Sequence, residues 1–270
     1  MQLSKRLQAV ADMVPRGSRV ADIGCDHAYV SLYLVKNRIA ETVVAMDVNK
    51  GPLQKAKENI KKHGCSEYID TRLSDGAMEL KQEEADVLLI AGMGGGLVQK
   101  ILLDSIELVK ECKALVLQPQ SEVANVRKYV SKIGFQIVEE KILIDEGKFY
   151  MMFRAEKMQN NCRIAEQKYS DGVNEEYLNL KNWDSEKPGL KDISLNKKFL
   201  EMSETEYKYG KLLLEKKDSC LHEFLKKEKK KYEQILDQLE KSDMCKNKEQ
   251  YEKMKQEYEY CKEGLSYYEM

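Results

Sequence analysis

An apolar stretch at residues 19–28 ends in a glycine turn and leads into a helical run, and this arrangement limits the fold more than any other feature. Arg19–Ile23 has the pattern of a buried strand, Gly24 begins the turn, and Tyr29–Lys36 has helical character. In an open α/β sheet, such a turn places backbone N–H groups at the carboxyl edge, where nucleotide-type ligands bind. The stretch therefore predicts either a cofactor site or an ordinary first turn, because a single glycine turn has low specificity.

Acidic residues end or follow the next two predicted strands. Thr42–Asp47 ends in an acid that lies 23 residues after Gly24, and Asp75 follows the third strand. An acid about 20 residues beyond the glycine turn is placed to accept hydrogen bonds from ribose hydroxyls. Alternatively, Asp47 caps the next helix, which we expect over residues 52–61 because proline favours the first helical turn.

A glycine-rich segment follows the most apolar strand of the chain. Ala85–Ala91 is a continuous apolar run, which is typical of a central strand buried on both faces. It leads into Gly92–Gly96, with four glycines in five positions. Without side chains, this backbone either allows another molecule to approach closely or forms a merely flexible loop.

The other apolar runs complete a Rossmann-like α/β domain of seven strands over residues 1–158. They predict strands at Tyr68–Leu73, Ala114–Leu117, Gln136–Ile144 and Lys148–Glu156. They predict helices at Leu3–Val14, Leu97–Val109 and Glu122–Ile133. We expect the last two strands to form an antiparallel pair around the short connection 145–147.

Residues 159–270 have helical character and predict a second domain. Residues 159–198 are polar and mixed, with one or two short helices expected. Farther on, apolar residues recur at seven-residue spacing and then at steps of three and four, which is typical of two packed helices. They are Leu214, Leu221, Leu225, Tyr232, Ile235 and Leu239, and then Tyr251, Met254, Tyr258, Cys261, Leu265 and Tyr268. Joined at about Ser242–Asn247, these helices form an antiparallel coiled-coil hairpin.

Charge is abundant but balanced, so any nucleic-acid binding has to come from local patches. Charged residues make up 34% of the chain, and the net charge is −1. One patch in the predicted hairpin consists of Lys226, Lys227, Lys229, Lys230 and Lys231. A second consists of Lys5 and Arg6, on the polar side of the first helix. Each patch is either a phosphate contact or an ordinary solvated face.

The cysteines and the apolar runs predict a reduced, metal-free protein away from membranes. The seven cysteines are scattered without a CxxC pair, and there are only three histidines, so we expect neither zinc nor a disulfide framework. No apolar run has the length of a membrane span, and the N-terminus lacks the pattern of a secretion signal. We expect a cytoplasmic monomer.

Four segments together resemble one group of class I S-adenosylmethionine-dependent methyltransferases. They are Leu3–Leu7, Val20–Tyr29, Gly92–Gly95 and Gln118–Gln120. In combination they are similar to the bacterial tRNA (adenine-N1)-methyltransferases that modify adenosine 22 of tRNA, and the similarity extends through the helical tail. The resemblance implies S-adenosylmethionine as cofactor, tRNA as partner and substrate, and methyl transfer to adenine N1.

The resemblance also implies roles for individual residues. Asp22 and Gly24 shape the cofactor turn, and Asp47 takes the ribose hydroxyls. Asp75 faces the adenine amine, and Gly76 gives it room. The place where methyl donor and target base meet is lined by Gly92, Met93, Gly94 and Gly95.

Asp26 departs from the usual glycine-rich turn, because Gly24, Asp26 and Ala28 stand where the common pattern has three glycines. Adenine N1 has a free lone pair, so its methylation needs alignment more than a strong base. A carboxylate that accepts from the N6 amino group also stabilises the charge that develops on the ring. We assign this role to Asp26, with His27 as orienter or proton carrier. His27 is equally well a structural histidine.

The target base has to leave its stack, because N1 lies on the pairing edge. Tyr29 and Met93 are candidates to hold it, and either is also suited to the core. The Asn/Asp-Pro-Pro-aromatic motif of exocyclic-amine methylation is absent after the fourth strand, and no Pro-Cys pair supports carbon-5 methylation.

Three other functions stay open. One is a small-molecule methyltransferase with a dimerising arm, and another is a tRNA-binding protein without turnover. An NAD-linked oxidoreductase fits the turn and Asp47 but not the final antiparallel pair.

Overall fold

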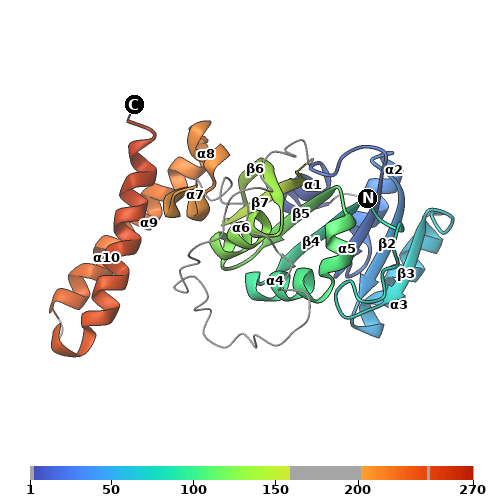
Figure 1. Ribbon diagram of the computed structural model, residues 1–270, viewed down its shortest axis with the longest axis horizontal. Helices are drawn as coiled ribbons and strands as arrows, with labels where there is room; N and C mark the ends of the chain where they lie inside the picture. The colour runs from blue at the N-terminus through green and yellow to red at the C-terminus, as the bar shows by residue number, and fades with distance from the viewer. Residues whose placement is uncertain (1–2, 159–201, 242–243, 270) are drawn as a thin grey trace, which may run out of the picture.

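A twisted sheet of seven strands forms the first part of the protein, with helices on both faces (Figure 1). The computed structural model describes residues 3–158, 202–241 and 244–269. The strands are β1 (Ser18–Ile23), β2 (Ala40–Asp47), β3 (Ile69–Leu73), β4 (Val87–Met93), β5 (Ala114–Pro119), β6 (Phe135–Asp145) and β7 (Lys148–Lys157). They lie in the order β3-β2-β1-β4-β5-β7-β6.

The strand directions confirm the predicted Rossmann-like fold. Strands β1 to β5 pair in parallel, whereas β7 pairs antiparallel with both β5 and β6. The chain order reverses between β1 and β4, and ligands bind outside the carboxyl ends of the strands at such a reversal. The two turns that the sequence singles out follow these same two strands.

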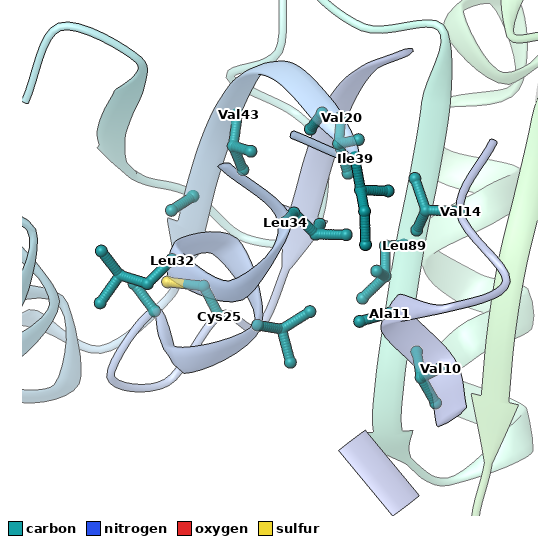
Figure 2. Close-up of a cluster of buried hydrophobic side chains, with 14 of the residues drawn as sticks. Val10, Ala11, Val14, Val20, Cys25, Leu32, Leu34, Ile39, Val43 and Leu89 are labelled. Carbon is teal, nitrogen blue, oxygen red and sulfur yellow. The ribbon is translucent and has the colours of Figure 1, made fainter. Parts of the chain in front are cut away.

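The core lies in two layers, one on each face of the sheet. The helices of the first domain are α1 (Lys5–Ala11), α2 (Tyr29–Lys36), α3 (Lys50–Lys62), α4 (Gly95–Asp104), α5 (Ile106–Glu111) and α6 (Val123–Lys132). Successive strand residues point to opposite faces. Val20 therefore lies in one cluster with residues of α1 and α2 (Figure 2) and of α3, whereas Ala21 lies in the other with residues of α4, α5 and α6.

The helix predicted over residues 97–109 is two helices. Ser105 has φ −117° and ψ 28°, outside the helical region, and separates α4 from α5. Leu102 and Ile106, on either side of the break, both pack in the core. The apolar spacing alone did not reveal this break.

The C-terminal part is a helical arm that stands off the β6–β7 edge of the sheet (Figure 1). Two short helices, α7 (Glu204–Tyr209) and α8 (Lys211–Glu215), precede the long helices α9 (Ser219–Lys241) and α10 (Met244–Ser266). Hydrogen bonds join Tyr251 to Glu240 and Tyr258 to Glu233, so residue numbers rise on one helix as they fall on the other. This pattern confirms the antiparallel hairpin.

Two details of the predicted arm are wrong. Leu214 lies on α8 rather than on the long helix, because Lys217, with φ +51°, interrupts the helix between them. The connection is also shorter than residues 242–247, since α10 already begins at Met244. The short helices expected within residues 159–198 lie outside the described residues.

A buried ion pair attaches the arm to the first domain. Arg127 on α6 donates from Nε to Glu140 Oε1 on β6 over 2.8 Å, and both side chains are fully buried. Arg127 also donates to the carbonyls of Tyr207 and Lys208, at 2.9 and 3.0 Å. The second Glu140 oxygen accepts from the Leu212 backbone N–H at 2.9 Å. The pair therefore ties α7 and α8 to the sheet.

Candidate active site

The turn after β1 is wound back toward β2. Gly24, with φ +73°, and Cys25 both donate backbone N–H groups to the Met46 carbonyl, at 2.8 and 2.9 Å. Asp26 and Ala28 also have positive φ values, +50° and +59°. The backbone therefore needs the left-handed conformation at all three places where the common turn has glycine. A side chain retained under such strain is a candidate for function.

Asp47 connects this turn with the next one. One carboxylate oxygen accepts from the Asn49 backbone N–H at 2.8 Å, and the other accepts from the Asp26 backbone N–H at 3.3 Å. The N-cap of α3 is Asn49, so the alternative that Asp47 caps this helix is wrong. The acid instead holds two loops together at the carboxyl edge.

Asp22 is buried at the end of β1 and faces α2. It accepts a hydrogen bond from the Ser31 hydroxyl at 2.6 Å. Burial raises the pKa of Asp22 to about 6, and the Ser31 hydrogen bond opposes that shift. Asp22 thus fixes the start of α2 against the strand that carries the turn.

The structure brings Asp26 and His27 together. Their side chains lie 3.3 Å apart between His27 Nε2 and Asp26 Oδ1, and the Asp26 side chain is 71% exposed. Asn59 on α3 donates to the His27 carbonyl at 3.0 Å, which holds the turn in place. The neighbouring Tyr29 ring lies 5.6 Å from the imidazole and is 41% exposed. An open carboxylate with an adjacent imidazole can accept a hydrogen bond from a ligand.

The glycine-rich segment reaches the same place from β4. The Met93 methyl group occupies the position where a side chain on Gly24 would begin, 2.2 Å from the ideal Cβ. Met93 therefore packs directly against the turn after β1. Gly94 is the N-cap of α4 and has an ordinary negative φ. Gly95 has a packing reason, because the Ser121 carbonyl lies 2.4 Å from where its Cβ would be.

Asp75 and Gly76 lie in the loop after β3. The Asp75 side chain is exposed, whereas Gly76 has φ +59° and packs against Ile101, whose Cγ1 is 3.0 Å from the ideal Cβ position. The Ser74 backbone N–H donates to the Asp47 carbonyl at 3.0 Å. This bond brings the loop to the end of β2.

Sequence reasoning missed three exposed apolar side chains at this edge. They are Val48 after β2, Leu73 at the end of β3 and Met78 in the following loop. Exposed apolar groups beside acidic ones suit a planar ring with polar edges. For Val48 and Leu73, the signal in the sequence is an apolar residue at or just beyond a strand end.

The two basic residues of α1 differ from each other. Lys5 is exposed, but Arg6 is half-buried and donates from Nη1 to Gln118 Oε1 at 2.6 Å. The alternative of an ordinary solvated face is therefore wrong for Arg6. Its guanidinium lies over the Tyr150 ring, 5.2 Å from the centroid, beside the glycine-rich segment.

The lysine patch lies on the exposed side of α9 in the C-terminal arm. The acidic residues Asp26, Asp47 and Asp75 belong instead to the carboxyl edge of the sheet. Lys227 pairs with Glu223 at 2.8 Å and lies over the Phe149 ring. Within the part of the chain that the structure describes, the exposed Lys226 and Lys230 have no acidic partner. These two ammonium groups are therefore available to an anionic ligand.

The described residues contain neither a metal-ligand cluster nor a membrane-spanning helix. No group of three or more histidine, cysteine or acidic side chains there has the arrangement of a metal site. None of the described helices combines the length and apolar character needed to cross a membrane. Cys25, Cys65, Cys112, Cys220 and Cys261 are free thiols.

The sheet order and the acidic carboxyl edge define a class I methyltransferase domain. The chain belongs to this family, since residues 3–153 match the family described as "Methyltransferase domain". More particularly, the chain is 38% identical over 156 residues to the tRNA (adenine(22)-N(1))-methyltransferase of Bacillus subtilis. That alignment covers 58% of this chain and 66% of the B. subtilis protein, slightly under two thirds of its length.

Solved structures resemble the protein over nearly its full length, arm included. The B. subtilis m1A22 tRNA methyltransferase TrmK has a TM-score of 0.75 at 28% identity, covering 98% of this chain and 99% of that one. The putative tRNA (m1A22) methyltransferase Sp1610 of Streptococcus pneumoniae, in complex with S-adenosyl-L-methionine, has a TM-score of 0.74 at 26% identity. This comparison covers 98% of this chain and all of that one.

Proposed function

We propose that this protein transfers a methyl group from S-adenosylmethionine to N1 of adenosine 22 in tRNA. The observation that carries the proposal is the meeting of the Asp26–His27 pair, Asp47 and the glycine-rich segment at one sheet edge. The similarity to the B. subtilis enzyme supports the choice of substrate. In this proposal, residues 1–158 form the catalytic domain and residues 159–270 bind tRNA. The expected cytoplasmic, monomeric state stays a prediction.

The residues at this edge fit the proposed cofactor. Asp47 would accept from its ribose hydroxyls, and Asp75 from its adenine amine, with Gly76 shaping that loop. The exposed side chains of Val48, Leu73 and Met78 would flank the ring. The turn formed by Asp22 and Gly24 would hold the amino-acid end, and Gly92, Met93 and Gly94 would border the methyl group. When bound, the cofactor supplies an activated methyl on a positively charged sulfur.

The chain's own residues would align and polarise the target base. Asp26 would accept a hydrogen bond from the N6 amino group, because its carboxylate is open to solvent at the turn. As N1 gains the methyl group, positive charge develops on the ring, and a nearby carboxylate stabilises it. His27 would orient Asp26 through their 3.3 Å contact. Tyr29 would stack on the extruded base.

Gly24→Ala should weaken S-adenosylmethionine binding by at least about tenfold, because positive φ at a non-glycine residue costs about 1–3 kcal/mol and the new Cβ would displace the Met93 methyl group from the turn. Calorimetric titration with the cofactor measures the effect. Gly64→Ala is the matched control, because Gly64 has φ +67° but no neighbour within 4 Å of its Cβ position. Unchanged binding by Gly24→Ala would argue against a cofactor at this turn.

Replacing Lys226, Lys227 and Lys230 together by glutamine should weaken tRNA binding. The slope of log affinity against log salt should fall in magnitude by about 2–3, because each lysine releases about one counterion when it neutralises a phosphate. The control replaces Lys55, Lys57 and Lys61, three exposed lysines of α3, by glutamine. Equal salt slopes for both triple variants would show that these lysines of the arm do not contact tRNA phosphates.

The proposed activity is tested by incubating the protein with labelled S-adenosylmethionine and unmodified bulk tRNA. We expect label in 1-methyladenosine after digestion to nucleosides. A tRNA-binding protein without turnover would bind the RNA and transfer no label. A small-molecule methyltransferase would likewise leave the RNA unlabelled, and its activity would survive loss of the arm.

A further inference from the structure

The end of β4 contains a bulge at the proposed site of methyl transfer. Ala91 pairs with Gln118 and Met93 pairs with Pro119 on β5, so Gly92 is an extra residue between them. Its φ of +81° turns the chain out of the regular ladder. A bulge of this kind redirects the following side chain, and it leaves a backbone group that needs another partner.

Gln118 provides that partner from the neighbouring strand. Its side chain is fully buried, and Oε1 accepts from the Gly92 backbone N–H at 3.1 Å. The same oxygen accepts from Arg6 Nη1 at 2.6 Å, and Nε2 donates to the Pro119 carbonyl at 3.3 Å. A single amide thus joins β4, β5 and α1 at the carboxyl edge. A buried amide satisfied on both its oxygen and its nitrogen has a fixed orientation.

The two residues that donate to Gln118, Gly92 and Arg6, connect it to different parts of the candidate site. The bulge directs Met93 onto Gly24, and the Met93 carbonyl accepts from the Gln120 backbone N–H at 2.8 Å. On the other side, Arg6 is held against Tyr150, and its backbone N–H donates to Asp145 at 3.1 Å. A shift of Gln118 would therefore move both Met93, which contacts Gly24, and the Arg6 guanidinium.

We propose that Gln118 is a positioning residue for methyl transfer, which acts through the Gly92 bulge and through Arg6. The proposal rests on the proposed function, because it concerns the alignment of the methyl donor with a tRNA base. Gln118 itself is fully buried, so it would act through the groups that it binds. Its importance comes from alignment, since a misplacement of about 1 Å at a reacting centre lowers the rate by about a hundredfold.

The test compares three substitutions at this position. Gln118→Leu removes the acceptor, and we expect kcat for tRNA methylation to fall about 10- to 100-fold while the dissociation constant of S-adenosylmethionine changes by less than about threefold. Gln118→Glu retains an oxygen for both Gly92 and Arg6 but puts an acceptor where Nε2 donates to the Pro119 carbonyl, so kcat should fall less than in Gln118→Leu. Gln118→Asn withdraws the acceptor without adding an apolar group, so it serves if the leucine variant does not fold. It should lower kcat by about tenfold or more.

Melting temperatures and cofactor titrations of the same variants separate alignment from folding. Wild-type kcat in Gln118→Leu or in Gln118→Asn would overturn the inference. Equal losses in Gln118→Leu and Gln118→Glu, with cofactor affinity lost in both, would also overturn it, because they would indicate a packing role alone. If the wild-type protein transferred no methyl group to tRNA, the proposed function would fail, and this inference with it. A loss of kcat that is larger in Gln118→Leu and Gln118→Asn than in Gln118→Glu, with cofactor binding retained, supports the positioning role of Gln118.

Discussion

Arg127→Met should lower the free energy of unfolding by about 3–5 kcal/mol, because it leaves the Glu140 carboxylate buried without its partner. The same substitution removes the donor that binds the Tyr207 and Lys208 carbonyls. We therefore expect the arm to loosen from the sheet, and tRNA binding to weaken even at temperatures where the variant remains folded. Urea unfolding measures the stability, and tRNA titration measures the second effect.

Two comparisons isolate the buried charge as the cause. The double variant Arg127→Met with Glu140→Leu should be more stable than Arg127→Met alone, because no unpaired carboxylate remains. Arg154→Met breaks a partly exposed pair between β7 and Glu139, the neighbour of Glu140 on β6, and should cost about 1 kcal/mol or less. A loss for Arg127→Met no larger than that for Arg154→Met would contradict the proposed attachment of the arm.

Asp26→Asn should lower kcat for tRNA methylation by about 100- to 1000-fold, which is the usual effect of removing one electrostatic contact to the transition state. Asparagine has the size of aspartate and tolerates the left-handed conformation that Asp26 adopts at φ +50°. The turn should therefore remain intact, and the affinity for S-adenosylmethionine should change by less than about threefold. Single-turnover kinetics together with cofactor titration measure both quantities.

The matched control for Asp26 is Glu83→Gln. Glu83 is also an exposed acid with positive φ, +62°, but it lies in the loop that leads into β4, at the opposite edge of the sheet. Its substitution should leave kcat unchanged. Full turnover by Asp26→Asn with normal cofactor binding would remove Asp26 from the mechanism.

The fold was predictable because its main elements repeat simple periodic patterns. The continuous apolar run before Gly92 marked the central strand, and the short connection after Asp145 marked the antiparallel pair. The break at Ser105 was not predictable, since Leu102 and Ile106 keep helical spacing across it. Likewise, heptad spacing included Leu214, although the left-handed Lys217 separates that residue from the long helix.

Residues of the candidate site were predictable from the sequence only where they lie at or just after the end of a predicted strand. The distance in sequence between Gly24 and Asp47 indicated both residues. In the structure, Asp47 accepts from the Asp26 backbone N–H in the turn after β1, and Gly24 donates to the Met46 carbonyl at the end of β2. Gln118 and Arg6 are joined across 112 residues, and no local pattern indicates such a contact. The partnership of Arg127 with Glu140 was missed for the same reason, because each residue alone has the appearance of a surface charge.

A pair of tRNA transcripts shows whether the protein methylates N1 of adenosine 22. The first carries adenosine at position 22, and the second is identical except for guanosine there. After incubation with the wild-type protein and S-adenosylmethionine, the modified position is mapped by reverse transcription, and nucleosides are identified by mass spectrometry. We expect 1-methyladenosine at position 22 of the first transcript and no methylation of the second. Equal methylation of both transcripts, or a methyl group at another atom, would contradict the proposed function.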